Sequence, residues 1–206
     1  MGAAEGRSCP GRQEVDATVT DASIPSLPVL RPRIAASGLV FVERHLFRLS
    51  DPEAPALRRA PLPAADSPVT TGAGPDLVLF SSVLEDGLVH ADLELWEHPV
   101  PEPSGPWDLT ALRELEIAGP HIVLASFVSG LVGDCVIPVP AGIYTLRACC
   151  RGRAAAHAAF LTWLDAEEEE EEAEEGAEPA AELGPSDGIE RWLLQLWPTP
   201  PAPTIT

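Results

Sequence analysis

The chain has 206 residues and a formal net charge of −19, from 32 acidic and 13 basic side chains. This length fits one domain, and a hydrophobic fraction of 45% is enough for a core of ordinary size. The acidity excludes direct contact with nucleic acid, which needs a basic surface to displace counterions from phosphates, and it disfavours anionic membranes. The remaining class of partner is another protein, and a basic protein is the specific candidate.

The composition also limits secondary structure and location. There are 23 prolines, which disfavour long helices and central strands. No apolar stretch is long enough to cross a bilayer, and Met1–Pro25 lacks the apolar region of a secretory signal. We therefore expect a cytoplasmic protein whose cysteines are free thiols. These are Cys9, Cys135, Cys149 and Cys150.

The N-terminal quarter contains one expected strand. Residues 1–32 are polar and aperiodic, which predicts a disordered N-terminal segment. Leu39–Leu49 is rich in β-branched and aromatic residues, which predicts a strand. Asp51–Pro75 is rich in Pro, Ala and Gly, which is typical of a long loop.

The clearest local signal is a predicted hairpin. Two apolar runs, Leu77–Leu84 and Leu88–Trp96, flank Glu85-Asp86-Gly87, and Asp-Gly between such runs favours a tight turn. The second run alternates between apolar and polar residues, which predicts a half-buried antiparallel strand. Its expected inward residues are Val89, Ala91, Leu93 and Leu95.

The middle of the chain predicts more strands. Trp107–Glu116 is expected to hold a short helical turn, and His121–Val128 a strand. Cys135–Val139 and Ile143–Cys150 are expected to pair as a second hairpin around Pro140-Ala141-Gly142. Pro138 places the first arm of that hairpin at a sheet edge, because proline cannot donate to the ladder.

The last part of the chain carries most of the charge. Ala154–Leu164 is ambiguous between helix and strand. Residues 165–186 are dense in glutamate, which predicts an acidic low-complexity loop inside the domain, because like charges repel and stay solvated. Glu190–Trp197 predicts a buried strand, and residues 199–206 a disordered tail.

These elements predict an all-β fold. Seven to nine short strands with hairpin turns favour one antiparallel β-sandwich over residues 33–198, with a β-barrel as the alternative. The acidic loop has three interpretations. It is an inert solvated insertion, an electrostatic decoy for the basic groove of a nucleic-acid-binding protein, or a weak site for hard cations.

The candidate site residues are polar or aromatic. His90, Asp92 and Glu94 share one strand face, which suits a metal or a positioned water, although a solvated strand face needs the same residues. Trp96, Trp107-Asp108 and Trp192 are candidates for a recognition surface, and core packing is the alternative. His45 beside Arg44 is a weaker candidate for a general base.

No catalytic residue, metal or cofactor is predicted. The chain has no nucleophile elbow, no glycine-rich phosphate loop and no zinc-binding helix motif. Asp134-Cys135 has no histidine at a recognisable spacing, so a cysteine hydrolase is disfavoured.

Several segments resemble known proteins. Pro138–Arg147, with its Pro-Ala-Gly-Ile-Tyr run, and Glu190–Pro198 resemble a group of β-proteins from GC-rich bacteria that end in a Leu-Gln-Leu-Trp-Pro-like segment and have no assigned activity. The early strand ending at Asp51 and the later Pro-x-Gly-x-Tyr strand are similar in layout to the competence protein J family of nuclease inhibitors. The second resemblance implies an inhibitor.

We therefore expect a non-catalytic domain that binds another protein, as an inhibitor or immunity-type protein against a basic partner such as a nuclease. A small-molecule or carbohydrate-binding β-sandwich that uses Trp96, Trp107 or Trp192 is the first alternative. A hydrolase that uses His90 and Asp92 is the second. Sequence alone predicts neither the strand order nor the oligomeric state.

Overall fold

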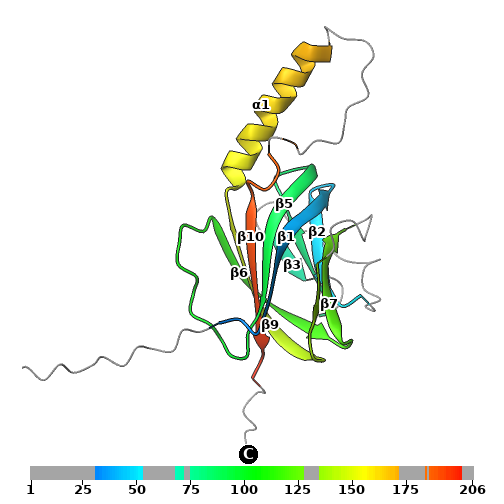
Figure 1. Cartoon of the computed structure of the whole chain (residues 1–206), viewed down its shortest axis with the longest axis vertical. Helices are drawn as coiled ribbons and strands as arrows, with labels where there is room; N and C mark the ends of the chain where they lie inside the picture. Colours follow the sequence, from blue (N-terminus) through cyan, green and yellow to red (C-terminus); the bar gives the residue numbers. More distant parts are fainter. Residues whose placement is uncertain are drawn as a thin grey trace, which may run out of the picture. The chain divides into compact units, whose positions relative to one another are not determined.

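The structure is a computed structural model that describes residues 31–52, 68–71, 75–127, 135–171, 184 and 186–200. Within these residues the chain forms one ten-stranded sheet and one helix (Figure 1). In chain order the elements are β1 (Ile34–Glu43), β2 (Leu46–Ser50), β3 (Val69–Thr71), β4 (Leu77–Ser81), β5 (Asp86–Leu95), β6 (Leu109–Ile117), β7 (His121–Ser126), β8 (Cys135–Pro138), β9 (Gly142–Arg151), α1 (Arg153–Glu171) and β10 (Arg191–Pro198).

The all-β prediction is confirmed, and the sheet adds detail that the sequence did not indicate. Its order is β3-β4-β2-β1-β5-β10-β9-β6, with β7 paired to β2 and β8 paired to β7. Strand β10 lies between β5 and β9, parallel to β5 and antiparallel to β9. Glu116 of β6 also donates its backbone N–H to the carbonyl of Pro75, in the connection between β3 and β4. The sheet is mixed, with one parallel pair.

The core lies on the inner face of this sheet. Val89, Ala91, Leu93 and Leu95 of β5 are buried, as their alternation predicts. Strand β10 places Trp192 among the rings of Phe47 and Phe80, with centroids 5.3 Å from each. The prediction of a buried strand near the C-terminus is confirmed, and β10 is central rather than peripheral.

The hairpin predicted around Asp86-Gly87 is wrong. Strand β4 pairs with β2 and β3, whereas β5 pairs with β1 and β10. The tight reversal lies instead at Arg44-His45, where both residues have positive φ, 52° and 66°, and it splits the predicted strand 39–49 into β1 and β2. Two positive φ values are the geometry of a primed hairpin turn, which usually carries Gly or Asn.

Two other local predictions are also wrong, because the strands pair with partners that are distant in the sequence. Strand β8 pairs with β7 and β9 pairs with β10 and β6, so the second predicted hairpin does not form. The helical turn predicted for Trp107–Glu116 is strand β6, because Leu115 and Ile117 alternate into the core against β9. The prediction that Pro138 marks a sheet edge is confirmed, since β8 has one neighbour within the described sheet.

Helix α1 resolves the ambiguous Ala-rich segment. It runs through Glu171, so the first part of the predicted acidic loop is helical, because Ala, Leu and Glu all favour helix. At its start Gly152 has φ of +82°, and a Cβ there would lie 2.5 Å from the carbonyl oxygen of Ile189. Only glycine fits this junction without strain.

Several predictions concern residues outside those described. They include the disordered N-terminal segment up to residue 30, the loop from 53 to 67, the remainder of the acidic loop from 172 to 183, and the tail from 201. Among the described residues, no helix combines the length and apolarity needed to span a bilayer.

Candidate functional site

The predicted polar face of β5 exists. His90, Asp92, Glu94 and Trp96 are partly exposed and point away from the buried side of the strand. Nδ1 of His90 lies 3.8 Å from Oδ2 of Asp92, and Nε2 of His90 lies 3.4 Å from Oγ of Ser37 on β1. The imidazole lies between a hydroxyl and a carboxylate, as in the Ser-His-Asp triad of hydrolases. The distance between His90 and Asp92 is nevertheless longer than a hydrogen bond.

The other end of this face has a structural role. Oε2 of Glu94 accepts hydrogen bonds of 2.9 Å from Nε1 of Trp96 and from Nε2 of Gln195 on β10. The Glu94 carboxylate and the Trp96 indole N–H therefore both form hydrogen bonds within the protein. Among the described residues, no three His, Cys, Asp or Glu side chains lie close enough together to hold a metal ion.

Trp107 and Asp108 anchor the connection between β5 and β6. The Trp107 ring lies 5.2 Å from the Arg151 guanidinium, and its Nε1 donates to the carbonyl of Pro103 at 3.2 Å. Oδ2 of Asp108 accepts a 3.3 Å hydrogen bond from the backbone N–H of Arg153, the first residue of α1. Asp108 thus stabilises the helix N-terminus, where a negative charge is favourable.

Trp192 does not belong to a surface. Its side chain is 1% exposed, and its Nε1 donates a 2.9 Å hydrogen bond to Oε1 of Glu190. The predicted candidates therefore separate into a strand face, a loop anchor and a core residue, and the structure does not gather them into one site.

Sequence reasoning missed a fully buried carboxylate that has several hydrogen-bond donors. Glu190 is fully buried, and besides Trp192 it accepts from Ser82 Oγ at 2.7 Å, from the Val83 N–H at 3.1 Å and from Arg153 Nη1 at 3.2 Å. These donors come from the segment after β4 and from the start of α1. Glu190 therefore joins the sheet to the helix, and one acidic residue before an apolar strand was the available signal.

Arg147 is a second buried charge that sequence reasoning missed. Its Nη1 donates to the carbonyls of Val100 and Pro101 at 3.1 and 2.9 Å, and its guanidinium lies 5.0 Å from the Trp197 ring centroid. It holds the proline-rich connection after β5 against the outer face of β9 and β10. The position of Arg147 between two apolar neighbours, Leu146 and Ala148, was the available sequence signal.

The described cysteines are free thiols, as predicted. Cys149 and Cys150 are both fully buried although they lie on opposite faces of β9. Burial raises the pKa of both thiols, and for Cys150 the nearby Glu190 carboxylate raises it further. Burial also raises the pKa of the Cys135 thiol. These environments disfavour the reactive thiolate.

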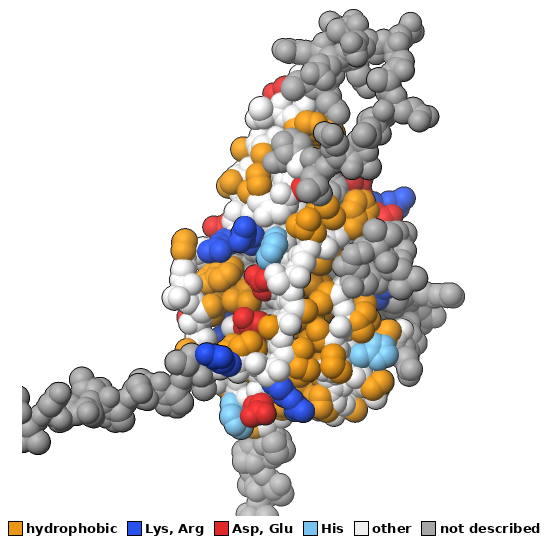
Figure 2. All heavy atoms as spheres, viewed as in Figure 1, with side chains coloured by type: hydrophobic (Ala, Val, Ile, Leu, Met, Phe, Trp, Pro, Cys, Tyr) orange, Lys and Arg blue, Asp and Glu red, His pale blue; other side chains and the backbone are white. Residues whose placement is uncertain are grey.

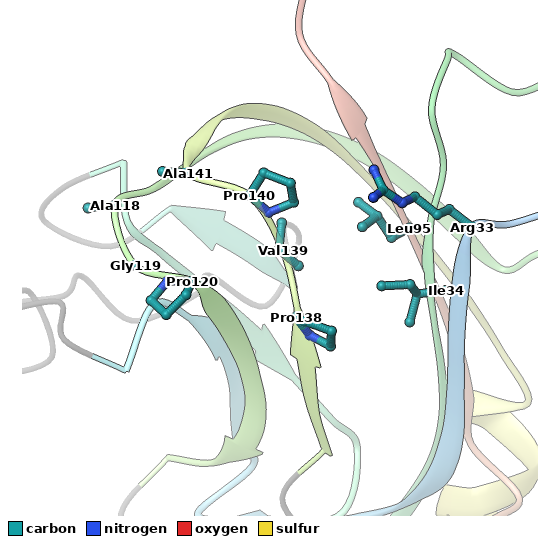
Figure 3. A pocket seen from close by; sticks show the side chains of 10 residues that line it. All are labelled: Arg33, Ile34, Leu95, Ala118, Gly119, Pro120, Pro138, Val139, Pro140 and Ala141. Carbon is teal, nitrogen blue, oxygen red and sulfur yellow. The ribbon is translucent and has the colours of Figure 1, made fainter.

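Two adjoining cavities lie at the end of the sheet opposite to Glu190. One has a volume of about 560 Å³ and is lined by apolar side chains and Arg33 (Figure 3). The other, of about 570 Å³, shares Arg33 and Leu95 and adds Trp96 and His98. Of the three tryptophans of the small-molecule hypothesis, Trp96 lines the second of these cavities, and Trp107 and Trp192 line neither of the two.

The described surface exposes more carboxylates than guanidinium groups. Its exposed arginines are Arg31, Arg33, Arg44 and Arg191. Its exposed carboxylates are Glu85, Asp86, Glu97, Glu102, Asp108, Glu114, Glu116 and Asp165. The acidity of the chain is therefore not confined to the glutamate-rich segment.

Comparison with solved structures finds similar folds at low sequence identity. Crocagin biosynthetic gene J is 17% identical, with a TM-score of 0.46, over 81% of this chain and 99% of that chain. ComJ from Bacillus subtilis, described as an inhibitor of the DNA degrading activity of NucA, is 10% identical, with a TM-score of 0.47, over 82% of this chain and 98% of that chain. ComJ is thus among the similar solved structures, which agrees with the resemblance to the competence protein J family. The chain matches no protein-family model and no curated protein.

Proposed function

We propose that the chain is a non-catalytic protein-binding domain that inhibits a basic partner such as a nuclease. The observation that carries this proposal is the excess of exposed carboxylates over exposed arginines, on a chain with a net charge of −19. ComJ is described as an inhibitor of the DNA degrading activity of NucA. We rest the proposal on charge and not on that likeness.

The bonding of the candidate side chains supports binding over catalysis. Glu94, Trp96 and Asp108 hold the sheet and its connections, and Glu190 is saturated with donors. Such committed groups give a rigid scaffold, and a rigid scaffold lowers the entropic cost of association. The hydrolase and small-molecule alternatives stay predictions.

The mechanism of such an inhibitor is competition by charge. A nuclease binds DNA through Arg and Lys side chains that contact phosphates. Carboxylates on a folded surface can pair with the same Arg and Lys side chains of the nuclease. Complementary charge also raises the rate at which the two proteins associate. Because the attraction is screened by salt, inhibition should weaken as ionic strength rises.

DNA protection tests this proposal directly. Purified basic nucleases would be mixed with the full chain, and the rate of plasmid degradation measured at about 50 and 500 mM salt, where the screening length differs about threefold. We expect protection at low salt for at least one nuclease, lost at high salt. An acidic nuclease is the matched control. The proposal fails if basic nucleases are never protected, or if the acidic nuclease is protected equally.

A further inference from the structure

Helix α1 exposes a cluster of large apolar side chains, which we call the apolar helix turn: Phe160, Leu161, Trp163 and Leu164. Leu161, Trp163 and Leu164 are 45%, 36% and 37% exposed. The Phe160 and Trp163 rings lie against each other, with centroids 6.1 Å apart. Figure 2 shows hydrophobic side chains on the surface of this helix. Contiguous exposed apolar surface is uncommon on a soluble domain and marks interaction sites.

The core does not account for this turn. The helix is attached at its start, where Arg153 Nη1 donates to the Ser81 carbonyl at 2.7 Å and to Glu190, and where Ala156 is fully buried. Phe160 packs partly against the core. Beyond it the helix continues to Glu171, and the side chains from Leu161 to Asp165 are all exposed.

The charge of the same helix indicates what covers the turn. After Leu164 its sequence continues Asp165-Ala166 and then five glutamates through residue 171, and its last turn holds no basic residue. The C-terminal end of a helix carries partial negative charge, so glutamates there are unfavourable. Glutamates four apart on a helix also repel. A cationic partner beside the apolar turn would relieve both effects, whereas a second copy of this chain would increase them.

We propose that the apolar helix turn docks into an apolar groove, rimmed by Lys or Arg, on a partner protein. This inference rests on the proposed function for the sign of the partner's charge, and it adds the element that makes the apolar contact. Recognition of one helix face by a groove is a recurrent mode of binding, in which residues three and four apart along the helix supply the anchors. Phe160, Trp163 and Leu164 have this spacing.

Two model peptides separate the apolar contact from charge alone. One is an amphipathic helical peptide of Leu and Lys, and the other has each Leu replaced by Ser at the same net charge. Binding of each labelled peptide to the full chain would be measured by fluorescence anisotropy at low salt. We expect the Leu/Lys peptide to bind at least about tenfold more tightly, which corresponds to the burial of one large apolar side chain.

Matched variants locate the contact. Leu161→Ser, Trp163→Ser and Leu164→Ser combined should abolish the tenfold preference. Ala155→Ser and Ala158→Ser, exposed on the same helix, should leave it unchanged. All five positions are exposed, so circular dichroism should show an unchanged sheet and the same cooperative melting for both variants.

Each contrary outcome has a distinct meaning. Equal affinity for the two peptides overturns the docking site but leaves the charge-based function standing. Absence of binding to both peptides contradicts the docking site and the proposed function together. If sedimentation shows a dimer that the triple variant converts to monomer, the turn is a self-association surface and the proposal is wrong.

Discussion

The two halves of helix α1 differ in almost every property that binding and stability depend on. In the first half Arg153 pairs with a fully buried carboxylate and Ala156 enters the core. From Leu161 onward, Leu161 and Trp163 are exposed, and the sequence then becomes a run of glutamates. This contrast indicates that the sheet and the helix start supply stability, while the helix end and the acidic surface are available for a partner.

The largest expected effect is at Trp192, in the stabilising part. Trp192→Ala should lower the free energy of unfolding by about 3–5 kcal/mol, because it opens a cavity between Phe47 and Phe80. Urea denaturation measures this change. Trp107→Ala is the control and should cost about 2 kcal/mol or less, since that partly exposed ring makes one stacking contact with Arg151 and one hydrogen bond to the Pro103 carbonyl. Equal losses for the two variants would contradict the assignment of Trp192 to the core.

The next effect is at the carboxylate that joins the sheet to the helix. Glu190→Ala should cost about 3 kcal/mol or more, because it removes the carboxylate that pairs with the Arg153 charge and leaves several buried donors without this acceptor. Glu114→Ala, at an exposed position on β6, is the matched control and should change stability by about 0.5 kcal/mol or less. A Glu190 variant as stable as this control would show that the junction does not hold the helix.

The smallest expected effect is on hydrolysis. Ser37→Ala should leave any p-nitrophenyl acetate hydrolysis by the chain unchanged. The Ser37–His90 and His90–Asp92 distances of 3.4 and 3.8 Å are long, and these residues line neither of the two cavities. A rate that falls by about 100-fold or more in the variant would favour the hydrolase alternative, because that is the contribution expected of an activated nucleophile with its base.

Sequence patterns predicted what depends on near neighbours along the chain. Alternation in β5 placed Leu93 and its neighbours in the core, and Pro138 marked an edge. Strand partners were not predictable in this way. Asp86-Gly87 indicated a hairpin, but β4 and β5 each bury their apolar residues against other strands, and the reversal fell at Arg44-His45 instead. Pairing energy comes from contacts across the sheet, which local turn preference does not contain.

The candidate site residues also divide into those predicted from near neighbours in the sequence and those that depend on distant contacts. The outward face of β5 follows from a period of two residues, so His90 and Asp92 were found together. Glu190 was not found, because its role exists only when β10, the end of β4 and the start of α1 meet around one carboxylate. Trp192 was ambiguous for the opposite reason, since an indole suits a core and a binding surface equally.

The central claim is that inhibition of a basic partner depends on the charge of the exposed carboxylates, while the sheet only holds these side chains in place. The most direct measurement is the protection of DNA from a basic nuclease by the full chain and by a variant in which five exposed glutamates, at positions 85, 97, 102, 114 and 116, are replaced by glutamine, which keeps the size of the side chain and removes its charge. The account predicts that the variant melts at the same temperature and protects at least about tenfold less well at low salt, through the loss of several charge contacts. Undiminished protection by this variant, or protection by the natural chain that does not change with salt, would contradict it.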